Sequence, residues 1–131
     1  MTVLFVCRHG AAKSILAAAD FRTLASLRGL QIEATAAGLD PAPEVAPVLL
    51  DALPADALDQ YKPRMVTAAD VAAASRVITF NLAPGELPIS GPLIERWDDI
   101  PSVSDNFEAA RASIGLRLQR LIEGYSSPDA G

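Results

Sequence analysis

The sequence predicts an α/β fold, in which a single three-layer domain has a four-stranded parallel sheet with helices on both faces. Short apolar stretches alternate with segments of helical composition along the chain, and such an order places neighbouring strands parallel. Half of the 131 residues are hydrophobic and 21% are charged, which is typical of a compact globular protein. We therefore expect one domain over residues 1–131, with a flexible tail at residues 126–131.

The first half of the chain is expected to contain two strands and two helices. The first strand is a short continuous apolar run, whereas the second partly alternates between apolar and polar residues. The first helix is rich in alanine, carries one apolar stripe and stops at Gly29. The second helix is entered near Pro43 and ends at Pro54. The strands are expected at residues 3–6 and 30–36, and the helices at residues 14–27 and 44–53.

The second half is expected to add two strands and two helices. After an irregular segment at residues 59–64, Thr67 caps a helix, and Asp70 reaches back in the manner of a capping box. The last helix is amphipathic and starts near Asp105 and Glu108. The strands are expected at residues 76–80 and 93–97, the helices at residues 67–75 and 107–122, and loops at residues 81–92 and 98–101.

Charge and cysteine content limit the possible partners. The net charge of −5 and the isoelectric point of about 4.7 leave no broad basic surface, so we expect no nucleic-acid partner. One cysteine allows neither an internal disulfide nor a cysteine-based metal cluster, and we expect no metal and no cofactor. No apolar stretch is long enough for a membrane span or a signal peptide, so we expect no membrane partner and a cytoplasmic location.

The single cysteine, Cys7, lies where the first predicted strand ends and shortly before a predicted helix begins. A helix N-terminus has free backbone N–H groups and the positive end of the helix dipole, so it favours anions and the reactive thiolate. Lys13 adds a positive charge at the same end. Ligands of parallel α/β sheets also bind at the carboxyl ends of the strands. Two independent arguments therefore predict an anion site at Cys7.

Five residues separate Cys7 from Lys13, which lets the backbone curl around a tetrahedral anion such as phosphate. Gly10 is able to adopt a positive φ, and Ala11 and Ala12 leave the loop uncrowded. Successive N–H groups then face the phosphate oxygens, and the sulfur lies beneath the phosphorus for in-line attack. The spacing predicts a phosphate-binding loop with a cysteine nucleophile.

The run from Val3 to Cys7, followed by Lys13 and Ser14, resembles the opening of the low-molecular-weight protein tyrosine phosphatases and the related thiol-dependent arsenate reductases. The signature of that family is a cysteine, five residues, an arginine and a serine directly after the first strand. The resemblance extends to residues 61–64, 67–70, 76–80 and 97–101 and to the long C-terminal helix. It implies the α/β fold and a phosphomonoesterase that forms a phosphocysteine.

Carried onto this chain, the resemblance implies a role for each residue of the loop. Cys7 is expected to be the nucleophile, Ser14 to orient its thiolate, and Lys13 to contact the phosphate in the transition state. The phosphate-binding residues are expected to be Arg8, His9, Gly10, Ala11, Ala12 and Lys13.

The loop departs from the family pattern at three positions. Lys13 replaces the arginine, and lysine is a flexible point charge where arginine grips two oxygens with a planar fork. The loss of one such contact in the transition state costs roughly 100- to 1000-fold in rate, unless Arg8 compensates. Gly10 replaces an asparagine that often supports the loop, and Ala12 replaces a second cysteine found in many of the phosphatases.

The Asp-Pro pair that usually carries the family's general acid is absent near Trp97. That acid protonates the leaving oxygen and later activates water against the phosphocysteine. Asp99 is the first choice for this role, Asp98 the second and Asp105 a distant third.

These residues also have purely structural interpretations. A lone cysteine after a buried strand is usually a small core residue, and a serine at a helix start is often only an N-cap. His9 has no second imidazole or matching carboxylate and is expected to be a loop residue. Tyr61 and Trp97 either wall a pocket or pack in the core. The spacing of the loop favours the functional interpretation of its cysteine.

Three functions are consistent with these features. The first is a phosphomonoesterase that acts through Cys7 on a phosphorylated substrate. The second is an arsenate reductase that uses an external low-mass thiol, because the chain has no further cysteine for an internal relay. The third is a catalytically inactive protein that binds phosphate or another oxyanion. We prefer the phosphatase.

Overall fold

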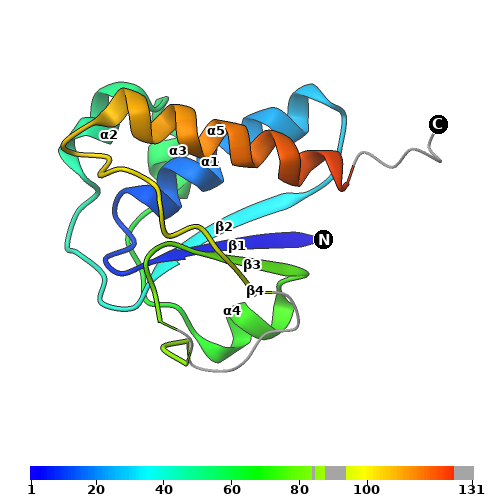
Figure 1. Ribbon diagram of the computed structural model, residues 1–131, viewed down its shortest axis with the longest axis horizontal. Coiled ribbons are helices and arrows are strands. Elements are labelled where there is room, and N and C mark those ends of the chain that lie inside the picture. Colours follow the sequence, from blue (N-terminus) through cyan, green and yellow to red (C-terminus); the bar gives the residue numbers. More distant parts are fainter. Residues whose placement is uncertain (84, 88–93, 126–131) are drawn as a thin grey trace.

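The computed structural model has a four-stranded parallel sheet in the order β2-β1-β3-β4, with helices on both faces (Figure 1). The structure describes residues 1–83, 85–87 and 94–125. The strands are β1 (Thr2–Cys7), β2 (Glu33–Gly38), β3 (Arg76–Thr79) and β4 (Ile94–Arg96). The helices are α1 (Lys13–Leu27), α2 (Pro47–Ala52), α3 (Ala55–Gln60), α4 (Ala68–Ala73) and α5 (Phe107–Glu123). This confirms the predicted three-layer α/β architecture.

The side chains of β1 alternate between the two faces of the sheet. Val3, Phe5 and Cys7 belong to the core shared with α1 and α5, whereas Leu4 and Val6 belong to the core shared with α4. Figure 1 shows α1 and α5 on one face and α4 on the other. A strand covered on both faces needs an apolar residue at every position, which explains the continuous apolar run in the sequence.

An aromatic cluster on the α1 side fixes the strand ends relative to one another. Phe5 contacts Phe21 of α1 edge-on at a ring-centroid distance of 6.0 Å, and Phe80 contacts Trp97 at 5.8 Å. All four rings are buried. Because these residues come from β1, α1 and the ends of β3 and β4, their packing holds together the edge at which Cys7 lies.

The boundaries of two predicted elements differ from the structure. Leu30 donates its N–H to Ala25 after Gly29 at φ +68°, so it completes the C-cap of α1, and β2 begins only at Glu33. The helix predicted over residues 44–53 begins at Pro47, where proline suits the first turn. A separate short helix, α3, was missed, because Pro54 both ends one helix and caps the next.

The helix starts of the second half were mostly predicted correctly. Thr67 and Asp70 form the predicted capping box of α4. The N-cap of α5 is Asn106, whose side chain accepts from the N–H of Ala109, rather than Asp105. Parts of the predicted loop at residues 81–92, position 93 of the fourth strand and the predicted tail at residues 126–131 lie outside the described residues. Among the helices that the structure describes, none is long and apolar enough to cross a membrane.

Candidate active site

Cys7 lies at the carboxyl end of β1 and borders a cleft of about 700 Å³. The residue is 8% exposed, so its thiol belongs both to the core and to the base of this cleft. The cleft is formed where several segments meet at one edge of the sheet, and its lining comes from residues 7–9, 11–13, 42–47, 80–81 and 102–104. The structure therefore places the predicted nucleophile where topology predicts a ligand.

The N-terminus of α1 is open to an anion. Its N-cap is Ala12, which has no side-chain oxygen with which to cap the first N–H groups. The first turn carries no acidic residue, and Lys13 begins it. Free N–H groups, the positive end of the helix dipole and an ammonium group therefore lie at the same end of α1.

Ser14 is fully buried, and its Oγ atom is hydrogen-bonded to Cys7 Sγ at 3.1 Å. The interpretation of this serine as a simple N-cap is therefore wrong, because it is the second residue of the helix and its side chain points to the thiol. An ionised sulfur only accepts hydrogen bonds, so the hydroxyl donates when Cys7 is a thiolate. This contact is the one that a serine needs for the orienting role that the resemblance implied.

Backbone hydrogen bonds hold the loop against the segment that follows β2. The loop carbonyls of Cys7, Arg8, His9 and Ala11 accept from the N–H groups of Leu39, Asp40, Ala42 and Ala46 respectively, at 2.7–3.3 Å. In a planar peptide the N–H points away from the C=O. These bonds therefore turn loop N–H groups away from residues 39–46, which leaves them for a ligand.

Gly10 adopts the predicted positive φ, at +57°, and packs directly on the backbone of Gly38. A Cβ atom on Gly38 would lie 2.5 Å from the Gly10 nitrogen, closer than real Cβ contacts allow. The loop conformation therefore depends on two glycines that are far apart in the sequence. The sequence analysis missed Gly38, because it ended the second strand at residue 36, whereas β2 extends to Gly38.

We expect Gly38→Ala to destabilise the protein by about 1–3 kcal/mol and to abolish phosphate binding, because the methyl group displaces the loop. Gly115→Ala is the matched control, since a Cβ at that helical glycine meets no atom within 4 Å. Alanine there is expected to stabilise α5 by up to about 1 kcal/mol. Thermal unfolding and phosphate titration measure both effects. Equal behaviour of the two variants would contradict the proposed role of the glycine contact.

Lys13 has a half-buried side chain beside the cleft, and this burial lowers the pKa of its ammonium group below the usual value of 10.5. The negative charges of Cys7 and Asp98 oppose this shift. With the Asn81 amide oriented so that both of its polar atoms find partners, its oxygen accepts from Lys13 Nζ at 2.9 Å. Lys13 is thus held close to both the thiol and the end of β3.

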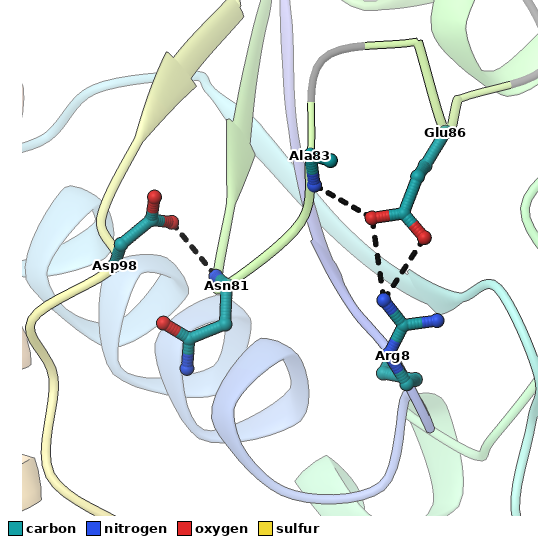
Figure 2. A network of polar contacts seen from close by, with 5 residues as sticks. All are labelled: Arg8, Asn81, Ala83, Glu86 and Asp98. Carbon is teal, nitrogen blue, oxygen red and sulfur yellow. Dashed lines mark hydrogen bonds and ion pairs between the residues drawn. The ribbon is translucent and has the colours of Figure 1, made fainter.

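Arg8 and His9 direct their side chains to neighbouring loops. The Arg8 guanidinium donates to Glu86 at 2.9 and 3.2 Å, and Glu86 also accepts from the N–H of Ala83 (Figure 2). These contacts, that of Ala83 first, lower the pKa of Glu86. The His9 ring bonds the carbonyl of Asp40 at 3.1 Å. Arg8 is therefore engaged elsewhere and does not replace the missing arginine in this structure.

The three predicted acids do not line the cleft. Asp99 forms an ion pair with Arg117 of α5, and Asp98 contacts Arg96 and the N–H of Asn81. Among the described residues that border the cleft, the one carboxylate belongs to Glu44, which is exposed and which the sequence analysis did not single out. No local pattern marks Glu44, because the fold of residues 39–46 brings it there.

Solved structures of two kinds of enzyme share this architecture. A thioredoxin-dependent arsenate reductase of Corynebacterium glutamicum is 24% identical with a TM-score of 0.76, over 94% of this chain and 60% of that protein. An arsenate reductase of Archaeoglobus fulgidus is 25% identical (TM-score 0.65), and a low-molecular-weight protein tyrosine phosphatase of Bacillus subtilis is 16% identical (TM-score 0.74). The Archaeoglobus match covers 92% of this chain and 98% of that protein. The Bacillus match covers 94% of this chain and 95% of that protein. The chain has the low-molecular-weight phosphatase fold.

This shared fold confirms the family resemblance that the sequence indicated. The present chain spans 60% of the length of the Corynebacterium protein. No protein-family model and no curated protein matches the sequence. The low-molecular-weight phosphatase fold is thus recognised from structure and from the short loop motif at Cys7.

Tyr61 and Trp97, which were expected either to wall a pocket or to pack in the core of this low-molecular-weight phosphatase fold, are both core residues. Trp97 is 1% exposed, and Tyr61 is 4% exposed and donates its hydroxyl to the carbonyl of Ala34. Neither borders the cleft. Among the described residues, no group of three or more histidine, cysteine, aspartate or glutamate side chains is placed to hold a metal ion.

Proposed function

We propose that the protein is a phosphomonoesterase of the low-molecular-weight phosphatase type, acting through a phosphocysteine on Cys7. One observation carries this proposal: the Cys7 sulfur lies at the base of a cleft, hydrogen-bonded to Ser14, beside the uncapped N-terminus of α1 and the Lys13 ammonium. Each of these neighbours favours the thiolate or a bound oxyanion. Solved neighbours named as low-molecular-weight protein tyrosine phosphatases, from Bacillus subtilis and T. tengcongensis, support the same reaction class.

In the proposed reaction, loop N–H groups and Lys13 bind the phosphate oxygens, and the thiolate of Cys7 attacks the phosphorus in line with the ester oxygen. The P–O bond to the leaving group breaks as the S–P bond forms, and the leaving oxygen takes up a proton. Water then attacks the phosphocysteine, which releases phosphate and returns the thiolate. A reducing compartment keeps such a thiol active, so we also propose a cytoplasmic location.

Trapping the intermediate tests this proposal. The protein is mixed with an aryl phosphate, quenched in acid, and digested for mass spectrometry. We expect a phosphoryl group on the peptide that contains Cys7. Phosphate release without any modification of this peptide would contradict the phosphocysteine route.

We propose Glu44 as the group that protonates the leaving oxygen, because it is the described carboxylate that borders the cleft together with Cys7. Glu44→Gln is expected to slow hydrolysis of an alkyl phosphate by about 100-fold, which is the usual contribution of a general acid. An aryl phosphate with an acidic leaving group needs no such proton, and its hydrolysis is expected to change little.

Steady-state rates with the two substrates measure this difference. Glu33→Gln, at an exposed glutamate of β2, is the matched control and is expected to alter neither rate. Asp99 and Asp98 remain the acids predicted from the sequence. If Asp99→Asn or Asp98→Asn, rather than Glu44→Gln, slows only the alkyl phosphate, the acid lies in that segment and the assignment of Glu44 is wrong.

Arsenate reduction is the second candidate, and the names of several structural neighbours favour it. Attack of Cys7 on arsenate would form an arseno-cysteine with loss of water. Because the chain has one cysteine, an external thiol must attack its sulfur, giving a mixed disulfide and arsenite: arsenic gains two electrons, and the two thiols lose them. A second external thiol would restore Cys7. Arsenite formation that depends on glutathione or thioredoxin supports this activity, and its absence with both excludes it for these reductants.

A further inference from the structure

The proposed function requires a lysine to do the work of an arginine. Lysine carries a point charge on a flexible stem, whereas the arginine fork is planar and preorganised. A lysine at this position therefore depends on its surroundings to hold the ammonium group near the bound anion. The structure shows what surrounds Lys13: Asn81 at the end of β3, with Asp98 behind it.

Asn81 is placed beside the loop by the pairing of β1 with β3. Val6 pairs with Thr79, and the N–H of Phe80 donates to the carbonyl of Val6 at 2.9 Å. Cys7 is therefore level with Phe80, and Asn81 follows one residue further along the chain. Cys7 and Asn81 both border the cleft. Asn81 is therefore close enough to reach the first residue of α1, and with its amide oriented as described above its side-chain oxygen accepts from Lys13 Nζ.

Asp98 fixes the conformation of Asn81. The backbone of Asn81 has φ +58°, a left-handed conformation that asparagine tolerates better than most residues. Its N–H donates to Asp98 Oδ1 at 2.8 Å (Figure 2), and its amide nitrogen, in the orientation given above, donates to the Asp98 carbonyl. Asp98 in turn pairs with Arg96 at 2.6 Å. The amide that faces Lys13 is thus held at its backbone and at its side chain.

We infer that Asn81 is a positioning residue, which holds the Lys13 ammonium at the oxyanion site, and that Asp98 holds Asn81 rather than acting as the general acid. This inference rests on the proposed function only in assuming an oxyanion ligand. It explains how the chain keeps a defined positive charge at the site without the arginine of the family signature. Asp98, the second choice for the general acid in the sequence analysis, is thereby assigned the role of holding Asn81.

The test combines Asn81→Gly with a double-mutant cycle. Glycine is the suitable replacement because it adopts φ +58° without strain, so the side chain is removed while the backbone is kept. We expect Asn81→Gly to weaken the binding of inorganic phosphate about 5- to 10-fold, the usual effect of one lost hydrogen bond. In a Lys13→Met background the same change is expected to have no further effect. Asn106→Gly, at the N-cap of α5 and outside the lining of the cleft, is the matched control and is expected to leave phosphate binding unchanged.

A second measurement needs no anion. Proton exchange between the Lys13 ammonium and water, followed through its ¹H–¹⁵N signal, is expected to be slow because Asn81 accepts a hydrogen bond from it. Exposed Lys62 is expected to show no such protection. Lys13 is expected to lose this protection in Asn81→Gly. Equal exchange of Lys13 in the wild type and Asn81→Gly, or an equal loss of phosphate affinity with and without Lys13, would overturn the inference. A protected Lys13 signal in a protein that binds no phosphate would instead refute the proposed function and leave the positioning of Lys13 supported.

Discussion

Cys7→Ser is expected to abolish phosphate release from an aryl phosphate, with a rate at least about 10⁴-fold below that of the wild type. The physical reason is that a serine hydroxyl is a far weaker acid than a thiol, so it is not ionised to the nucleophilic form at neutral pH. A thiol ionises far more readily than a hydroxyl and is stabilised as an anion by the N-terminus of α1. Steady-state phosphate release measures the effect.

The variant must also be shown to fold, because Cys7, the last residue of β1, packs in the core that β1 shares with α1. Serine is close to cysteine in size, so the thermal unfolding midpoint and the fluorescence of the buried Trp97 are expected to change little. Phosphate binding by the variant is expected to persist, since the loop N–H groups and Lys13 remain. A folded Cys7→Ser protein with wild-type turnover would show that the sulfur is not the nucleophile.

Lys13→Arg is expected to raise turnover of an aryl phosphate about 10- to 100-fold, because the fork of arginine restores a second contact to the equatorial oxygens. The substitution is also expected to change the pH dependence. Burial lowers the pKa of Lys13, so its positive charge is present at neutral pH and is lost as the pH rises toward 10.5, before an exposed lysine would lose it. Phosphate affinity of the wild type is therefore expected to fall over this alkaline range, whereas arginine stays charged.

Phosphate titration between neutral and alkaline pH checks this prediction. Lys62→Arg is the matched control, because Lys62 is the other lysine of the chain and is exposed outside the cleft. It is expected to keep the wild-type profile. The same alkaline loss of affinity in Lys13→Arg as in the wild type would mean that another group titrates, and would remove Lys13 from the anion site.

The local parts of the site could be predicted from the sequence because they lie within one strand, one loop and one helix start. The positions of Cys7, Gly10 and Ser14 follow from a buried strand, a spacing of five residues and a helix of known composition. The parallel order of the sheet then places this junction at a ligand-binding edge. The structure agrees with the strand, the conformation of Gly10 and the helix start, and the binding of a ligand at this edge stays a prediction.

Gly38, Glu44 and Asn81 could not be predicted, because each reaches the site through tertiary pairing. Gly38 matters because β2 pairs with β1 and brings its end onto Gly10. Glu44 and Asn81 come from the segments after β2 and β3, and their neighbours in the sequence carry no motif. The predicted start of the second strand was wrong for a related reason. The C-cap of α1 extends through Leu30, which the sequence pattern alone assigns to the next strand.

Alkylation of Cys7 by iodoacetamide at neutral pH, with and without inorganic phosphate, tests the central claim most directly. An anion site at the N-terminus of α1 predicts that the single cysteine reacts faster than a free low-mass thiol such as glutathione under the same conditions. Phosphate is expected to protect it. Alkylation no faster than that of glutathione, with no protection by phosphate, would contradict an activated thiol in an oxyanion site.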